Sequence, residues 1–398
     1  MRDPKSDAWL TIIGLGEDGP EGLSPASHAA LAAAEVIFGG PRHLDLIAAG
    51  GKGRPWPVPF DPTPVLAHRG KPTVVLASGD PFWFGAGGSL MTHLSPGEWL
   101  SHPAPSTFQL SANRMGWKLE ETLCLGLHAA PFARLRPLLG RGVRVICTLR
   151  DGAAAAELAR WLAENGHPNA WLTVLERLGG PQERISRALP TKPVGADPIG
   201  APVSAAIEAT DPGLPRASGL PDELFQHDGQ ITKRPVRALT LSALAPRPGE
   251  VLWDIGAGSG SVGIEWLLAG GARVEALEAD PTRAARARGN VEGFGLSHRH
   301  RLTEARAPEG LGGLAAPDAV FIGGGASAAV LTAVWDLIPS GARLVMNAVT
   351  LETEALVLDW SARLGGSLLK IELSEPAAIG RKRGWKSALP ILQWSVTR

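Results

Sequence analysis

Small residues and an acid gather in one short stretch of the chain, at 251–266. An apolar run ends on Asp254 and is followed by Gly256, Gly258 and Gly260, after which apolar residues recur with helical spacing. This order predicts a strand, a tight turn and a helix whose first amide groups point back toward the turn. Glycine suits the turn because a Cβ atom would block the close approach of a ligand to the backbone. The stretch therefore predicts a site for a nucleotide-like ligand.

Two acids favour S-adenosylmethionine as this ligand over a dinucleotide. Asp254 lies where its carboxylate could meet a cationic amino group but would repel a pyrophosphate. Glu278 ends the next predicted strand, and an acid in that place can accept hydrogen bonds from both ribose hydroxyls. The spacing leaves NAD open, because Gly258, Gly260 and Gly263 also satisfy the G-x-G-x-x-G dinucleotide fingerprint. A glycine turn without a ligand is the remaining alternative.

A second glycine-rich turn, Gly14-Leu15-Gly16, follows a strand predicted at 9–13. It begins another G-x-G-x-x-G spacing, but a dinucleotide site needs a helix within the glycines, and Pro20 keeps this segment in a loop. The helix is predicted to begin later, with Ser24 as its N-cap and Pro25 at its first position. The spacing at this turn therefore does not indicate a dinucleotide.

A polar turn also follows the continuous apolar strand predicted at 73–76. Ser78-Gly79-Asp80-Pro81 brings backbone amides and a carboxylate to the carboxyl end of this strand, where open α/β sheets bind ligands. The segment thus predicts a ligand-binding edge in the first half of the chain. An ordinary proline turn is the alternative interpretation.

The composition excludes several classes of protein. The formal net charge is zero and there are two cysteines, which argues against a nucleic-acid partner, a disulfide framework and a thiolate metal site. None of the 10 histidines has a metal-ligand spacing such as H-E-x-x-H, so we expect no bound metal. No apolar run reaches the roughly 18 residues that span a bilayer, and the N-terminus lacks a signal peptide. We expect a cytoplasmic protein without a membrane partner.

The length of 398 residues predicts two domains, separated by a segment rich in proline and glycine. We place the first domain at 1–210, the linker at 211–222 and the second domain at 223–398. In the second domain strands alternate with helices, and the chain ends in a pair of strands near 368–373 and 389–394. This pattern predicts an α/β fold with a mostly parallel sheet, helices on both faces and an antiparallel closing hairpin.

Segments in both halves carry a family resemblance. Those of the first half are G-L-G at 14–16, A-S-G-D-P at 77–81, P-S at 105–106 and E-R-L-G-G-P-Q-E at 176–183. Those of the second half are D-G-Q-I-T-K-R-P-V-R at 228–237, the turn at 254–260 and D-A-V-F-I-G-G at 318–324. Through them the chain resembles the bifunctional precorrin-6Y C5,15-methyltransferase (decarboxylating) family of cobalamin biosynthesis. The resemblance implies a tetrapyrrole methylase fold followed by a Rossmann-like class I S-adenosylmethionine-dependent methyltransferase fold.

This resemblance implies two activities on one chain. The first domain would methylate precorrin-6B (6Y) at C5, and the second would methylate C15 and remove the ring C (C12) acetate carboxyl as carbon dioxide, giving precorrin-8. It also implies two S-adenosylmethionine sites per chain, each leaving S-adenosylhomocysteine, and a homo-oligomer, with a tetramer through the second domain as one form. The residues that would contact the donor are Gly14, Leu15, Gly16, Gly79, Asp80, Pro81, Gly85 and Ser106 in the first domain, and Thr232, Asp254, Ile255, Gly256, Gly258, Gly260, Glu278, Ala307 and Gly323 in the second.

The acceptor of such a reaction carries many carboxylates, so its site should contain fixed cations. Lys233, Arg234 and Arg237 lie just before the glycine turn, and Lys233 and Arg237 are expected to act in catalysis there. His227 and Asp228 are candidates for proton transfer during decarboxylation, although a His beside an Asp is more often structural. The basic segment 381–386 could lie over an anionic ring, and its alternatives are a solvated hairpin tip or a nucleic-acid contact.

Two positions depart from the family pattern. Arg306 stands where relatives often carry an acid, so we do not assign its side chain to donor binding. The segment G-L-H-A-A at 126–130 only partly keeps the family's serine-leucine-histidine-glycine segment, which leaves a role for His128 open. Three other functions stay as alternatives: a sensor or scaffold that binds the nucleotide without chemistry, a nicotinamide-dependent oxidoreductase, and a methyltransferase acting on RNA or protein.

Overall fold

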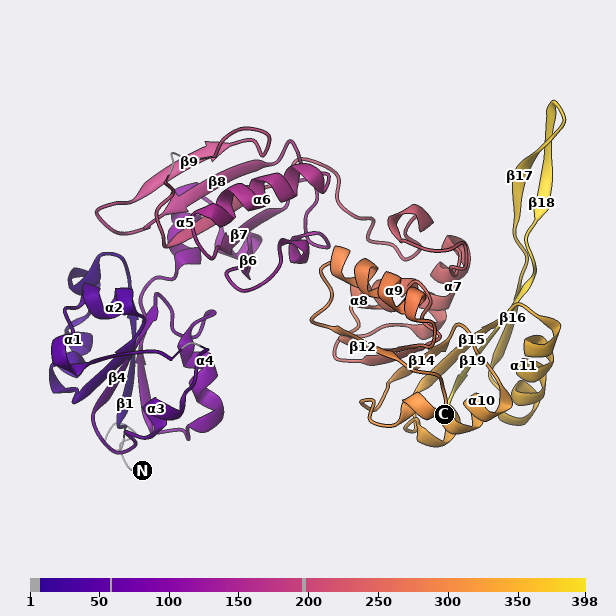
Figure 1. The fold of residues 1–398 in the computed structure, drawn as a ribbon, viewed down its shortest axis with the longest axis horizontal. Coiled ribbons are helices and arrows are strands. Elements are labelled where there is room, and N and C mark those ends of the chain that lie inside the picture. Colours follow the sequence, from indigo (N-terminus) through magenta and orange to yellow (C-terminus); the bar gives the residue numbers. More distant parts are fainter. Residues whose placement is uncertain (1–7, 58, 195–197) are drawn as a thin grey trace. The chain divides into compact units, whose positions relative to one another are not determined.

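The computed structural model describes residues 8–57, 59–194 and 198–398. The chain forms two compact units. The first ends at Pro212, and the second runs from Gly213 to Arg398 and takes in Ala133–Leu138. This division falls inside the segment for which a linker was predicted, 211–222. Both units are α/β structures (Figure 1), as the sequence predicted.

The first unit begins with a parallel sheet in the strand order β3-β2-β4-β1-β5. Its strands are β1 Leu10–Leu15, β2 Val36–Gly39, β3 Gly53–Pro55, β4 Thr73–Ser78 and β5 Trp99–His102. Its helices are α1 Pro25–Ala33, α2 Pro41–Leu46, α3 Thr63–Leu66 and α4 Ala86–Leu90. Val65 of α3 and Leu90 of α4 pack on one face, and Leu31 of α1 and Leu44 of α2 pack on the other. The inner strands are therefore buried on both sides, which explains their continuous apolar sequences.

A mixed sheet follows in the first unit, with the strand order β6-β7-β10-β8-β9. Its strands are β6 Leu123–Gly126, β7 Arg144–Thr148, β8 Trp171–Glu176, β9 Arg184–Ala188 and β10 Val203–Glu208, and its helices are α5 Thr107–Met115 and α6 Ala153–Glu164. β6 and β7 are parallel, and the remaining pairs are antiparallel. Phe108 and Ala112 of α5 pack against Ile146 and Leu175 of this sheet.

Local side-chain chemistry sets where the first helices begin. The Ser24 hydroxyl accepts a hydrogen bond from the Ser27 amide, and Pro25 holds the first helical position, which confirms the predicted start of α1. Ser106 caps α5 in the same way, and its own amide donates a reciprocal hydrogen bond to the side-chain oxygen of Gln109. Each cap satisfies amide groups that the first turn of a helix leaves without partners.

The second unit contains a sheet in the order β13-β12-β11-β14-β15-β19-β16, parallel from β13 to β15 and antiparallel at β19. Its strands are β11 Val251–Ile255, β12 Arg273–Glu278, β13 His300–Glu304, β14 Ala319–Ile322, β15 Arg343–Ala348, β16 Ser367–Ile371 and β19 Ile391–Thr397. Its helices are α7 Arg234–Leu244, α8 Ser261–Leu268, α9 Pro281–Gly293, α10 Ala328–Leu337 and α11 Leu351–Leu364. The first three pack on one face and the last two on the other, as predicted (Figure 1).

The antiparallel closing pair is confirmed as β16 and β19. Between them lies a two-stranded arm whose strands we did not predict, although a solvated hairpin tip at 381–386 was one of the alternatives for this segment. Its strands, β17 Ser374–Ile379 and β18 Lys382–Ser387, pair with each other and project from the sheet (Figure 1). Both faces of the arm are largely exposed, so its strands do not need alternating apolar residues. The sequence therefore contains no pattern that would predict these two strands. The basic segment 381–386 lies on it, and Trp385 is 77% exposed. Across the described ranges, no helix is long and apolar enough to cross a membrane.

Candidate functional site

A cavity of about 1130 Å³ opens at the carboxyl ends of the parallel strands in the second unit. The loops after β11 to β15 line it, together with the segment that precedes α7 and the chain that enters β19. Of the residues predicted from the sequence, those that line it are Thr232, Lys233, Ile255, Gly256, Gly258, Glu278, Ala307 and Gly323. The predicted turn, the predicted ribose acid and one predicted cation thus meet in one cavity.

The glycines of the turn bring two loops into close backbone contact. Gly256 has φ 72°, and a Cβ atom there would lie 2.7 Å from the carbonyl oxygen of Gly324 and 2.8 Å from its nitrogen. Gly258 also has a positive φ, 58°, and lines the cavity, whereas Gly260 caps α8 and lies against Ala287. Side chains in these places would separate the loops after β11 and β14 and fill the ligand space.

Glu278 is held in place from two sides. One carboxylate oxygen accepts a hydrogen bond from the Gly258 amide at 2.7 Å, and the other accepts one from the Asp280 amide at 2.9 Å. The side chain is almost fully buried but reaches the cavity. Each oxygen keeps a lone pair for a hydroxyl group, so the carboxylate is oriented to accept bonds from a ribose. Glu278, held by the Gly258 amide, therefore fits a nucleoside donor.

Asp254 lies beneath the turn, so its predicted direct contact with the donor's amino group needs correction. The Asp254 side chain is buried, and Asp254 is not among the described residues that line the cavity. Its Oδ2 accepts a hydrogen bond from the Gly263 amide at 3.2 Å, in the first turns of α8. Strand β11 turns alternate side chains to opposite faces, and this one points toward α8. Asp254 therefore supports the turn from below.

Arg237 is also corrected, because its guanidinium cannot reach a substrate. The side chain is completely buried in α7, where Nε donates to Glu265 at 2.6 Å and Nη1 donates to Asp222 at 3.0 Å. Further bonds go to the carbonyl oxygens of Thr232 and Leu220. With its donors used inside the unit, Arg237 joins α7 to α8 and to the segment before α7. Lys233, at the N-cap of α7, is half-exposed and lines the cavity.

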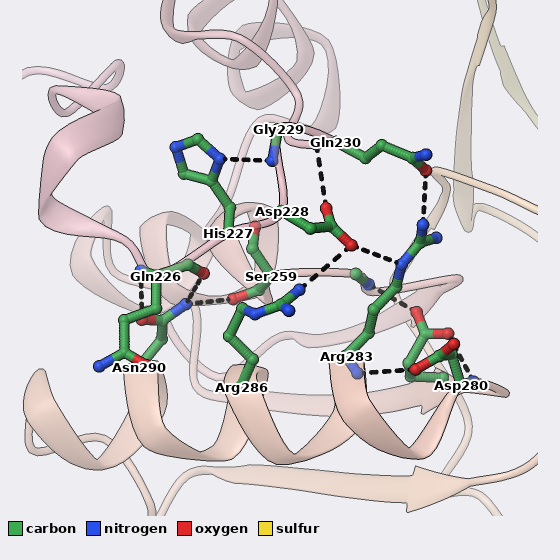
Figure 2. Close-up of polar contacts among 12 residues, drawn as sticks. Gln226, His227, Asp228, Gly229, Gln230, Ser259, Asp280, Arg283, Arg286 and Asn290 are labelled. Carbon is green, nitrogen blue, oxygen red and sulfur yellow. Dashed lines mark hydrogen bonds and ion pairs between the residues drawn. The ribbon is translucent and has the colours of Figure 1, made fainter.

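Helix α9 fastens the loop at 226–230 that precedes α7 (Figure 2). Asp228 accepts bonds from the Gln230 amide and from Arg283, and Arg286 forms an ion pair with it at 3.2 Å. The hydrogen bond from the Gln230 backbone amide and the guanidinium groups of Arg283 and Arg286 lower the pKa of Asp228 to about 2. A carboxyl group that stays ionised at neutral pH is a poor proton donor, so a role for Asp228 as the proton donor is corrected. Asp228 holds the loop on α9.

Figure 2 shows two further contacts along the same loop. Asn290 of α9 donates to the carbonyl oxygens of Gln226 and Ser259, which ties the loop to the glycine turn. His227 turns away from this contact, and its Nδ1 accepts a bond from the Gly229 amide at 3.0 Å. Among the described residues His227 does not line the cavity. Its role in proton transfer stays a prediction.

Sequence reasoning missed several residues of the cavity wall. They include Gln230, Asp280, Arg283, Gly324, Gly325, Asn347 and Leu389. A signal existed for Gly324 and Asn347, because both lie at the carboxyl ends of strands that were predicted, where parallel sheets bind ligands. Leu389 follows the arm and carried no such signal. Arg306, which we left unassigned, also lines the cavity.

In the first unit, glycines pack the carboxyl edge of the parallel sheet. A Cβ atom on Gly14 would overlap the carbonyl oxygen of Gly79 and lie 2.6 Å from the Ala104 nitrogen. Gly79 has φ 56°, and its Cβ would lie 2.7 Å from Cα of Ser106. The predicted residues Gly14, Gly79 and Ser106 therefore meet at one edge. Asp80 accepts a bond from the Phe82 amide, and a Cβ on Gly85 would lie 2.5 Å from the Pro81 carbonyl oxygen.

The hollow at this edge of the first unit measures about 40 Å³. It is lined in part by Leu15, Gly16 and Gly79, and Arg42 reaches across it to Glu17 and to the Ser78 hydroxyl. This volume holds water but not a nucleoside. In this form the hollow does not fit the donor. His128 lies outside the described lining of the hollow and contacts Thr148 at 3.2 Å.

Comparison with known proteins settles the family. Residues 9–191 match the family model of tetrapyrrole (corrin/porphyrin) methylases, and residues 223–398 match that of the precorrin methyltransferase domain. A precorrin-6Y C(5,15)-methyltransferase [decarboxylating] from Sinorhizobium sp. is 46% identical over 98% of this chain and 96% of its own. The chain belongs to the precorrin-6Y C(5,15)-methyltransferase (decarboxylating) family. Another relative of that name, from Mycobacterium tuberculosis, is 38% identical over 98% of this chain and 100% of its own.

The family assignment confirms the resemblance, the fold class and the methyltransferase activity expected from the sequence. Among solved structures, the C-terminal domain of precorrin-6Y C5,15-methyltransferase from Rhodobacter capsulatus is 50% identical. It covers 46% of this chain and 100% of its own, with a TM-score of 0.46. Membership of this family also favours a methyltransferase over a nicotinamide oxidoreductase or a sensor without chemistry.

Proposed function

We propose that the first unit methylates a precorrin at C5, and that the second methylates it at C15 and decarboxylates the ring C acetate, each with its own S-adenosylmethionine site. The observation that carries the proposal is the cavity of about 1130 Å³ in which Glu278 is oriented by the Gly258 amide. A cavity of this size is larger than a single drug-sized ligand needs, so it can hold a donor beside part of a large ring. We place the activity in the cytoplasm.

The residues of the second unit act by positioning. Bound S-adenosylmethionine supplies an activated methyl group, so the protein needs no nucleophile of its own. Glu278 orients the ribose, and the turn at Gly256 lets the backbone approach the nucleoside. Lys233 offers its ammonium group to a carboxylate of the acceptor from the cavity wall. A site that excludes water favours both in-line transfer and loss of a desolvated carboxylate.

The donor site of the first unit lies at the carboxyl edge of its parallel sheet. Leu15, Gly16 and Gly79 lie at the carboxyl ends of parallel strands, where open α/β sheets bind ligands. The match of this half to the tetrapyrrole methylases supports a donor site in the first unit. The hollow there would have to widen, which requires the side chains of Arg42 and Glu17 to move apart. Donor binding to this unit is therefore expected to involve a rearrangement of that contact.

Calorimetry of the full chain with S-adenosylhomocysteine tests the two sites. We expect two sites per chain, and we expect Glu278→Ala to remove one of them, because it deletes the ribose acceptor and frees the Gly258 amide. Glu304→Ala is the matched control, since Glu304 ends the neighbouring strand β13 but pairs with Arg288 on the surface. One site in the unchanged chain would contradict the two-site proposal, and no site would contradict the methyltransferase mechanism.

We also propose a homo-oligomer that forms through the second unit. The arm carries apolar side chains in contact with solvent, with Ile379 66% exposed and Trp385 77% exposed. Exposed apolar surface of this kind marks interaction sites. Light scattering should give a mass that is a multiple of 41.6 kDa, and Ile379→Asp with Trp385→Asp should reduce it to that of one chain. A monomeric unchanged chain would contradict this proposal.

A further inference from the structure

A buried polar network ends on one residue of the cavity wall in the second unit. Asn347, at the carboxyl end of β15, is half-buried and lines the cavity. Its Nδ2 donates to Thr240 Oγ1 of α7 at 2.9 Å, and its Oδ1 accepts from Gln393 Nε2 of β19 at 3.0 Å. Gln393 Nε2 also donates to Thr240 Oγ1 at 3.2 Å. Thr240 and Gln393 are themselves buried, so two further elements hold the amide group of Asn347.

The Thr240 hydroxyl fixes the direction of every bond in this network. Its single proton is donated to the Val236 carbonyl oxygen at 2.9 Å, so Oγ1 can only accept from the two amides. Both amides therefore turn their nitrogen toward Thr240, and Gln393 gives its second N–H to Asn347. One N–H of Asn347 is used on Thr240, and the other has no partner among the described residues. A ligand in the cavity can accept a hydrogen bond from it.

Asn347 lies on the acceptor side of the cavity. Glu278, the proposed ribose acid, ends β12, and both β11 and β14 lie between β12 and β15. Neighbouring strands are about 4.8 Å apart, so roughly 14 Å separate the ends of β12 and β15 across the sheet. A ribose held by Glu278 cannot also contact Asn347. Asn347 therefore borders the space that the donor leaves for the acceptor.

The cavity wall around Asn347 carries apolar side chains. Val236 of α7, Phe321 of β14 and Ile391 of β19 line the cavity there. Apart from Lys233, the charged side chains of the described lining come from the end of β12, from the start of α9 and from the loop after β13; they are Glu278, Asp280, Arg283 and Arg306. A group bound at Asn347 therefore meets one neutral N–H in an apolar part of the cavity.

We propose that Asn347 donates a hydrogen bond to the acetate carboxylate that the acceptor loses, and that it is a catalytic residue of the decarboxylation. The inference rests on the proposed function of the second unit. In this step the bond between the carboxyl carbon and the methylene carbon breaks, and carbon dioxide leaves. The electron pair of that bond passes through the methylene carbon into the conjugated ring system. A proton from solvent then converts the methylene group to a methyl group.

A neutral donor suits a carboxylate that must leave. A cation would stabilise the carboxylate more than the transition state, in which the negative charge moves into the ring, and would slow the step. The Asn347 amide orients the carboxylate without neutralising it, and the apolar wall keeps water away from it. Lys233 lies about two turns, or 10 Å, before Thr240 along α7. Its ammonium group suits a carboxylate that stays on the ring.

Mass spectrometry of the products tests the proposal on the full chain with a precorrin acceptor and S-adenosylmethionine, because it counts methyl and carboxyl groups separately. Asn347→Leu keeps a similar shape without the N–H and should slow the loss of carbon dioxide by roughly 10- to 100-fold. The product should carry the C15 methyl and retain the acetate carboxyl. Calorimetry should give an unchanged affinity for S-adenosylhomocysteine at the site that Glu278→Ala removes. Ser395→Ala, on the same face of β19 but outside the described lining, is the matched control and should follow the unchanged chain.

An Asn347→Leu protein that slows C15 methylation and decarboxylation equally, or slows neither, would overturn the proposal. If this variant does not fold, Gln393→Met decides, because it keeps Asn347 and removes the bond that orients its amide. Gln393 is a positioning residue, so Gln393→Met should slow decarboxylation, by a smaller factor, and leave C15 methylation unchanged. Equal slowing of both steps in that variant would also overturn the proposal. An unchanged chain that neither methylates C15 nor releases carbon dioxide would instead contradict the proposed function.

Discussion

Arg237→Ala is expected to destabilise the second unit by about 3–5 kcal/mol, because it leaves the buried carboxylate of Glu265 without its cation. Arg237 is fully buried and also binds Asp222 and the Leu220 carbonyl oxygen, so the loss extends to the segment before α7. Hydrogen exchange followed by mass spectrometry measures this locally. The amides of α8 should lose protection, while those of the first unit should keep it.

Lys233→Ala provides the control, because Lys233 is half-exposed and lies 3.9 Å from Asp222. It should leave the protection of α8 unchanged and should instead raise KM for the acceptor. The double variant Arg237→Met with Glu265→Leu should recover much of the stability, since it removes both buried charges. An Arg237→Ala protein with full protection of α8 and a defect in turnover alone would restore the catalytic role first predicted for this residue.

Gly256→Ala and Gly14→Ala are expected to separate the two methylations. The added methyl at 256 would lie 2.7 Å from the Gly324 carbonyl oxygen at a φ of 72°, so the cavity wall must shift. A shift of about 1 Å is enough to reduce turnover by roughly 100-fold. Gly256→Ala should therefore reduce C15 methylation and decarboxylation and spare C5. Gly14→Ala should do the reverse, because its methyl would overlap the Gly79 carbonyl oxygen.

Two glycines without close neighbours serve as controls for this pair. A Cβ atom on Gly289 in α9, or on Gly88 in α4, would meet no atom within 4 Å, and neither residue has a positive φ. Gly289→Ala and Gly88→Ala should leave both methylations unchanged. Mass spectrometry of the product identifies which methyl and which carboxyl group are present. Equal loss of both methylations in either test variant would show that the units do not act independently.

The sequence predicted the features that depend on neighbours along the chain. The cap at Ser24, the glycine turn after Asp254 and the acid at the end of β12 all follow from spacing within one element or one turn. The parallel sheet then brought Glu278 beside Gly258, because the carboxyl ends of adjacent strands share an edge.

The features that could not be predicted depend on contacts between residues that are far apart in the sequence. Arg237 stands among basic residues next to the turn, and its burial becomes visible only once Glu265 on α8 is known to face it. Asp228 likewise reads as a free carboxylate until α9 brings Arg283 against it. The arm escaped prediction because its exposed strands carry no apolar period. The sequence shows which side chains carry a charge. Only the fold shows whether a charged side chain is free to contact a substrate or is already bound inside the protein.

The contacts of Arg237 also decide where the chain can be divided to engineer two separate enzymes. Its partner Glu265 accepts bonds from the amides of Gly219 and Leu220, and Arg237 itself binds Asp222. An excised second unit that starts at residue 223 would lack Gly219, Leu220 and Asp222, and with them these contacts. The apolar core residues that Leu220 covers would then become exposed. The cleavage point for an independent C15 enzyme therefore belongs upstream of Gly219.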